Sequence, residues 1–215
     1  MESQCRLGDK IIELLGPAGF ERVDWLDQDI NIILAAFQPE SCLTLAIYAE
    51  PAAWEKFYAE VYGRNPKDLA YFASISTPAM FLDENLSGPA PDVIRQIFSS
   101  VRRLSEEEAA RSVRRGSAAL LEAGTLALAP FDLIEGRENY VSFETRLGTV
   151  QKNEEDEELF REHYRLIVSA VLVQGKMVLL NLYSNRHNEP PEEARRLALA
   201  WRDAYLAKAG LEISK

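Results

Sequence analysis

The clearest pattern of hydrophobic and polar positions lies in the last third of the chain. Residues 164–173 and 176–183 are two apolar runs rich in strand-forming side chains, separated only by Gln174-Gly175. A two-residue connection that contains glycine is typical of a tight hairpin turn, because glycine accepts a positive φ. The first run is apolar on both of its faces, which indicates a central strand that is covered on both sides.

A helix is predicted to follow this hairpin. Pro190-Pro191 fits its first turn, and Gly210 fits its end. Between them, apolar residues recur at helical spacing and form one stripe: Ala194, Leu197, Ala198, Trp201, Ala204 and Tyr205. We expect the helix to pack against the hairpin through this stripe.

The first third of the chain predicts a similar order of elements. Residues 30–37 and 42–48 are rich in strand formers, and the polar stretch between them contains a proline, so the pair fits a second hairpin. Pro51 then fits the first turn of a helix that runs to about Tyr62.

A short internal similarity links the two regions. Residues 45–48 and 180–183 share the pattern L-x-(I/L)-Y, and each is followed by a proline-initiated helix that contains a tryptophan. Two similar hairpin-plus-helix units in one sheet are one interpretation. The alternative is that both segments follow the same general rules for strands and helices, and so short a match does not decide between them.

The remaining pattern predicts further strands and helices. Residues 11–15 fit either a short helix or a strand, and Gly16-Pro17 ends whichever of the two forms. Further strands are expected at residues 20–25, 69–75, 79–82 and 140–150, and helices at 92–104 and from the capping box Ser105–Glu108 to about Ala123. The predicted fold class is α+β, with residues 1–215 in a single domain.

Composition narrows the class of protein without identifying it. Of the 215 residues, 47% are hydrophobic and 27% are charged, as in ordinary globular domains. The net charge of −10 argues against nucleic acid as a partner, because its phosphates would be repelled. No apolar run approaches the ~18 residues of a membrane span, so no membrane-spanning helix is expected.

The start of the chain and the two cysteines bear on its compartment. Residues 1–10 lack the basic and apolar regions of a signal peptide, so a cytoplasmic location is expected. An exported protein whose leader has been removed is the alternative. Cys5 and Cys42 are too few for a disulfide framework or a metal cluster, and Cys42, in a strand-like run, is expected to be a buried thiol.

The sequence contains no familiar catalytic or cofactor-binding signature. Patterns such as GxGxxG, GxxxxGK(S/T), HExxH, GxSxG and CxxC do not occur in it. With only His163 and His187, a centre with several histidine ligands is excluded. Asp24, Asp27 and Asp29 lack the glycine and the final glutamate of a calcium loop. We therefore expect no cofactor, no bound metal and no catalytic residue.

Two polar segments are candidate binding sites. One is the loop between the last predicted strand and helix, which groups an imidazole, a guanidinium and two amides in Asn185, Arg186, His187 and Asn188. The other lies within residues 152–162, where six acids against two bases give a net charge of −4. Its candidate contacts for a basic partner are Glu154, Glu155, Glu157 and Glu158. An ordinary solvated loop is the alternative for both segments.

The two ends of the chain resemble one known family. The stretch Ile11-Ile12-Glu13-Leu14-Leu15-Gly16-Pro17-Ala18-Gly19-Phe20 looks like the opening of PsbP-like and Mog-like proteins. The hairpin around Gln174-Gly175-Lys176 and the closing helix around Trp201 resemble their C-terminal half. The resemblance implies an α/β/α sandwich with a mostly antiparallel central sheet, and a strand at residues 11–15. It implies no catalytic residues, because known members act by binding partners or ions.

These patterns favour a non-enzymatic binding or accessory protein that acts through a protein partner. The competing hypothesis is a cofactor-independent enzyme in which His187 is the general base and Asp24 or Glu144 orients it. A structural homodimer is the third hypothesis, and the sequence leaves the oligomeric state open.

Overall fold

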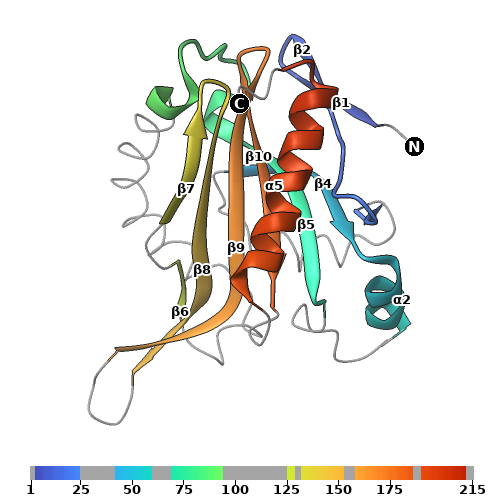
Figure 1. The fold of residues 1–215 in the computed structure, drawn as a ribbon, viewed down its shortest axis with the longest axis vertical. Helices are drawn as coiled ribbons and strands as arrows, with labels where there is room; N and C mark the ends of the chain where they lie inside the picture. The colour runs from blue at the N-terminus through green and yellow to red at the C-terminus, as the bar shows by residue number, and fades with distance from the viewer. Residues whose placement is uncertain are drawn as a thin grey trace.

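The centre of the molecule is an eight-stranded antiparallel sheet (Figure 1). A computed structural model describes residues 3–24, 42–59, 69–93, 125–128, 132–152, 158–185 and 190–211. The strands of this sheet are β3 (Glu21–Arg22), β4 (Cys42–Ala49), β5 (Tyr71–Pro78), β6 (Thr125–Leu128), β7 (Asp132–Arg137), β8 (Tyr140–Lys152), β9 (Glu158–Val173) and β10 (Lys176–Ser184). Their order is β3-β4-β5-β10-β9-β8-β6, and β7 also pairs with β8. The predicted α+β fold with a mostly antiparallel sheet is therefore confirmed.

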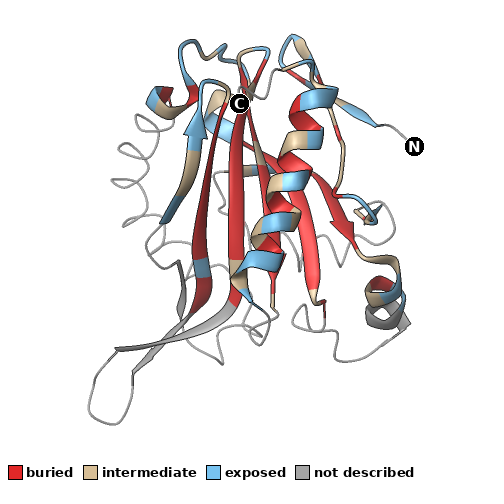
Figure 2. Ribbon diagram, viewed as in Figure 1, coloured by how far each residue is buried: buried red, intermediate tan, exposed pale blue. Residues whose placement is uncertain are grey.

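The hairpin predicted from Gln174-Gly175 forms at the centre of this sheet. Gln174 has a φ of 53° and Gly175 a φ of 81°, and two successive positive values are what the favoured two-residue hairpin turn requires. β9 lies between β8 and β10, and its residues 166–171 are buried on both faces, which Figure 2 shows as the red part of this strand. The prediction of a central strand covered on both sides is confirmed.

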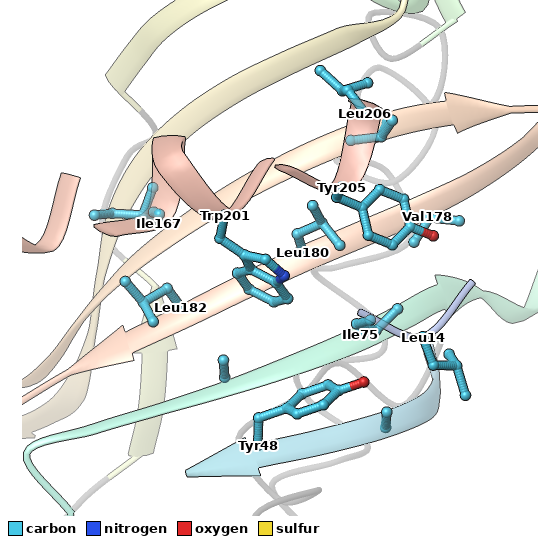
Figure 3. Packing of buried hydrophobic residues seen from close by; sticks show 14 of the residues in the cluster. Leu14, Tyr48, Ile75, Ile167, Val178, Leu180, Leu182, Trp201, Tyr205 and Leu206 are labelled. Atoms are coloured by element: carbon cyan, nitrogen blue, oxygen red, sulfur yellow. The ribbon is translucent and has the colours of Figure 1, made fainter. Parts of the chain in front are cut away.

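One face of the sheet, called here the α5 face, is covered by helix α5 (Pro191–Lys208). Trp201 and Tyr205 pack against Ile167, Leu180 and Leu182 (Figure 3). The small hairpin of β1 (Gln4–Leu7) and β2 (Lys10–Glu13) contributes to the same core. Residues 10–13 therefore form a strand, which settles the ambiguity of the sequence pattern.

The opposite face has an aromatic core of its own. The rings of Phe72 and Tyr183 are stacked with centroids 4.3 Å apart, and Tyr164 meets Phe72 edge-on at 5.6 Å. Trp54 of helix α2 (Pro51–Ala59) belongs to this core, and so does Val93 at the end of the helical residues 90–93. The predicted helix start at Pro51 is confirmed.

The two tetrapeptides that share the pattern L-x-(I/L)-Y lie on strands that flank β5. β4 and β10 both run antiparallel to β5, and helices α2 and α5 follow them in the chain. Tyr48 stands opposite Ala73, whereas Tyr183 stands opposite Phe72. Because a shift of one residue reverses the face of a strand, Tyr48 points to the α5 face and Tyr183 to the opposite face.

Three details differ from the sequence predictions. Residues Ala79–Phe81 form a short 3-10 helix, η2, and not a strand, because β5 ends at Pro78, which has no N–H to continue the ladder. Cys42 is half-buried, because it begins a strand at the end of the ladder. On α5, Ala204 is exposed while Arg202 is buried.

Several predicted elements lie outside the described residues. They are the strand at 30–37, residues 60–62 of the helix that begins at Pro51, the part of the helix at 92–104 that follows residue 93, and the helix from Ser105 to Ala123.

Candidate functional site

Both predicted binding segments attach to the same end of the central sheet. β8 ends at Lys152, β9 begins at Glu158 and β10 ends at Ser184. Because these three strands are antiparallel neighbours, these ends point to the same side of the molecule, where α5 also begins (Figure 1). We call this region the strand-end region.

The acidic segment belongs to a two-stranded extension that we call the β8–β9 arm, residues 148–152 and 158–162. The ladder between β9 and β10 stops at Arg165, whereas the ladder between β8 and β9 continues to the pair Lys152–Glu158. The seven residues of β9 that precede Arg165 span ~23 Å at the usual rise of a strand. In Figure 1 the arm extends beyond the ends of the other strands.

The arm narrows towards its end. β6 pairs with β8 only as far as Val150, so the pairs Gln151–Leu159 and Lys152–Glu158 have no third strand beside them in the described chain. Glu158 is therefore placed at the outer end of the arm. Glu154, Glu155 and Glu157 lie outside the described residues, in the five-residue connection between Lys152 and Glu158.

Only one residue of the predicted polar loop is described. Asn185 is half-buried, and its backbone N–H donates to the carbonyl oxygen of Ala70 over 3.1 Å, which fixes the end of β10 beside β5. Arg186, His187 and Asn188 lie outside the described residues.

The two acids considered as partners of His187 are both held by arginines. The carboxylate of Glu144 accepts from Nε of Arg195 at 2.6 Å and lies 3.3 Å from Nε of Arg165. The hydrogen bond to Glu144, followed by its charge, raises the pKa of Arg195 above its usual value. Asp24 accepts from Nε and Nη2 of Arg22 at 2.7 and 2.8 Å.

These contacts give each carboxylate a structural role that accounts for its position. Glu144 is 8% exposed, and its two oxygens join β8 to β9 and to the first turns of α5. Asp24 also accepts the backbone N–H of Ile47 at 3.3 Å, which fixes β3 against β4. The pairing of either acid with His187 stays a hypothesis, because the imidazole is outside the described residues.

Sequence reasoning missed a buried arginine on the α5 face. Arg202 is 3% exposed, and its Nη1 donates to Oγ of Ser142 at 3.0 Å and to the carboxylate of Glu135. Its Nε and Nη2 donate to Oδ1 of Asp203 at 2.9 and 2.7 Å. The guanidinium carbon also lies 4.1 Å from the centre of the Tyr140 ring.

The electrostatic balance at Arg202 favours a permanent charge. Burial by itself lowers the pKa of Arg202, but the hydrogen bonds to Asp203 and Glu135 outweigh this effect and raise it. Ser142 in turn shares a hydrogen bond of 2.8 Å with Ser169 on β9. The result is a polar network that joins α5 to β7, β8 and β9 through the middle of an otherwise apolar layer.

A sequence signal for this network existed. Three alternate residues of β8 share the α5 face: Tyr140, Ser142 and Glu144. Ser142 and Glu144 are thus polar residues on a face that the strand pattern predicts to be buried. Arg202 stands four positions after Ala198 on the buried side of α5. Buried polar groups require partners, and each of these residues supplies one to another element.

A second buried cation lies at the other end of the sheet. Lys176 is 1% exposed, and its ammonium donates to the carbonyl oxygens of Leu82 at 2.9 Å and Glu84 at 2.8 Å. The backbone N–H of Leu86 donates to the carbonyl oxygen of Gly175 at 2.7 Å. These bonds fasten residues 82–86 to the β9–β10 turn.

The described part of the chain contains neither a metal site nor a membrane-spanning helix. No three His, Cys, Asp or Glu side chains are grouped there in a way that suits a metal ion. Among the same residues, no helix is both long enough and apolar enough to cross a membrane.

Comparison with known proteins supplies no relative. Neither protein-family models, curated proteins nor solved structures match this chain. The strand-end region and the arm are therefore the candidate site of this chain.

Proposed function

We propose that this chain is a non-enzymatic binding or accessory protein that docks a basic protein partner through the β8–β9 arm. The observation that supports the proposal is the position of Glu158 at the end of an arm that extends past the β9–β10 ladder. A ribbon of this kind presents its end to a partner without disturbing the core. The acids that follow Lys152 in the sequence give that end a strongly negative charge.

The polar loop is proposed as a second contact of the same partner. Asn185 directly follows β10 at the same end of the sheet as the arm, and its backbone is fixed to Ala70. Loops held by a rigid scaffold are common positions for binding residues. The loop that continues from Asn185 to Asn188 therefore starts from a fixed point near the base of the arm.

A quantitative pull-down tests this proposal. The arm variant replaces Glu154, Glu155, Glu157 and Glu158 by glutamine, which keeps the size of each side chain and removes its charge. The matched control replaces four exposed acids at the other end of the sheet, Asp9, Asp83, Glu84 and Glu138, by asparagine or glutamine, and a third variant replaces the loop residues 185–188 by alanine and serine. A partner that docks on the arm is recovered with wild type and control, and is lost with the arm variant.

The recovered partner is then measured directly against the purified proteins. Binding that depends on the arm weakens as salt rises from about 50 to about 300 mM, because screening shortens the reach of exposed charges. If the arm and loop variants both retain every partner of the wild type with unchanged affinity, the proposed docking surface is wrong.

We further propose that the fold is an α/β/α sandwich of the PsbP-like and Mog-like type. The support is that α5 covers one face, while Trp54 of α2 and Val93 of the helical residues 90–93 pack on the other. An experimental structure that shows the second face covered by strands or irregular chain, and not by helices, would contradict this assignment.

A further inference from the structure

Strand β7 forms an exposed edge of the sheet. It pairs with β8 on one side, and within the described residues no strand pairs with its other side. Leu133 is 71% exposed, and Asp132, Gly136 and Arg137 are exposed as well. The outer N–H and C=O groups of an edge strand are a template for pairing with another chain.

The sequence of β7 is complementary to itself in antiparallel pairing. β7 spans Asp132 to Arg137, with the sequence Asp-Leu-Ile-Glu-Gly-Arg. When a second copy runs antiparallel about a twofold axis between positions 134 and 135, Asp132 of each copy stands opposite Arg137 of the other. Opposite charges directly across a strand pair are stabilising, and the symmetry provides this pair twice.

The faces of β7 agree with this register. Asp132 and Arg137 pair with Glu144 and Tyr140 of β8, so both side chains stand on the α5 face. In an antiparallel pair, directly opposed residues must share a face, and these two do.

The apolar residue of the edge is accommodated in the same register. Leu133 and Gly136 pair with Phe143 and Val141, so both stand on the opposite face. The side chain of Leu133 would therefore lie above Gly136 of the second copy, where no side chain competes for the space. An exposed leucine beside a glycine is a poor arrangement for a free edge and a good one for this pairing.

We propose that two copies of this chain associate edge to edge through β7, in the register that places Asp132 opposite Arg137. The two sheets then form one continuous sheet, with both α5 helices on the same side. Six residue pairs bury less surface than the ~1,200 Å² of a stable interface, so the association is weak and depends on concentration.

Charge-swap variants test the proposed register. Sedimentation velocity is measured for each protein from about 1 µM to about 500 µM, the range in which a weak dimer forms. Asp132→Arg sets two arginines against each other across the strand pair, and Arg137→Asp sets two aspartates against each other. Each single variant is expected to weaken dimerisation about tenfold or more.

Two recombinations of these changes distinguish the register from general charge effects. The double variant Asp132→Arg/Arg137→Asp restores both pairs with reversed polarity and is expected to dimerise like wild type. An equimolar mixture of the two single variants restores both pairs between unlike copies, so it is expected to form a heterodimer although neither variant dimerises alone. Circular dichroism and thermal unfolding establish that every variant is folded.

Two results would overturn the proposal. One is a wild-type protein that remains monomeric at the highest concentration. The bulge between Leu133 and Glu135 and the charged residues of β7 would then serve to prevent edge-to-edge pairing. The other is a dimer whose affinity does not change in the single variants, which would place the interface elsewhere. The pull-down of a basic partner is independent of both results.

Discussion

Replacing Arg202 by methionine tests whether the buried polar network fastens α5 to the sheet. The guanidinium donates to Ser142, Glu135 and Asp203 and lies against the ring of Tyr140. Methionine has a similar length and no charge, so the change removes these polar contacts and retains much of the packing volume.

The expected loss of stability follows from the exposure of each partner. The hydrogen bond to the buried Ser142 contributes about 1 kcal/mol, and the contact with Tyr140 contributes about 1 kcal/mol. Glu135 and Asp203 have side chains 34% and 40% exposed, and screening by water limits each of these ion pairs to about 0.5 kcal/mol. Apolar packing by methionine offsets part of the loss, so the free energy of unfolding should fall by about 2 kcal/mol.

Urea unfolding, followed by tryptophan fluorescence and circular dichroism, measures this difference. Arg196→Met is the matched control, because Arg196 lies on the same helix with a side chain 75% exposed and one ion pair to Glu193. It should change the free energy of unfolding by less than about 0.5 kcal/mol. If Arg202→Met is no more destabilising than this control, the network does not stabilise the fold and the reasoning is wrong.

Three further changes address other parts of the fold. Lys176→Met should lower the free energy of unfolding by about 2 kcal/mol and speed hydrogen exchange at Leu86, because two carbonyl oxygens lose a buried donor. Gly16→Ala should cost about 2 kcal/mol, because a Cβ there would lie 2.3 Å from a ring carbon of Tyr48. Its control Gly19→Ala, at a φ of +82° in open space, should cost about 1 kcal/mol. Tyr48→Phe should leave stability at pH 7 equal or higher, because the buried hydroxyl has no hydrogen-bond partner in the described structure. Burial raises the pKa of Tyr48 above its usual value of 10, so wild type should lose stability above pH 10, where the unfolded chain loses this proton first, and the variant should lose less.

For each of these three predictions, one experimental result would contradict the physical reason given. Unchanged exchange at Leu86 in Lys176→Met would mean that residues 82–86 are held by other contacts. A smaller cost for Gly16→Ala than for Gly19→Ala would mean that the ring of Tyr48 moves aside freely. An identical alkaline loss of stability in wild type and Tyr48→Phe would assign the alkaline transition to other groups, such as Tyr205, whose pKa burial also raises.

Local patterns predicted the elements whose cause is local. The turn at Gln174-Gly175 and the end of α5 at Gly210 each depend on a positive φ at a glycine. The glycine is visible in the sequence, so both features could be predicted from it. The central position of β9 was predictable because its residues are apolar at successive positions, which only a strand covered twice can bury.

Features with a distant cause were not predictable in the same way. The short apolar run at residues 11–15 fits a helix as well as a strand. Only the pairing of β2 with β1 shows that it forms a strand. The burial of Arg202 requires Ser142, which is 60 positions earlier in the chain, and the position of each partner follows from the sheet order. In the strand-end region, the sequence marks the polar loop and the acidic run but cannot show that both attach to one edge.

The order of strands in the sheet has a consequence for how the chain folds. β8, β9 and β10 follow one another as a meander, so their contacts are local and can form quickly. The pairing of β5 with β10 is not local, because its contacts, such as the hydrogen bond from Asn181 to Ser74, join positions 107 residues apart. Trp201 donates to the carbonyl oxygen of Leu15, which is 186 positions away. During synthesis the edge of β5 therefore stays without this partner until residue 184 has been made, and the first half of the chain is then most vulnerable to aggregation.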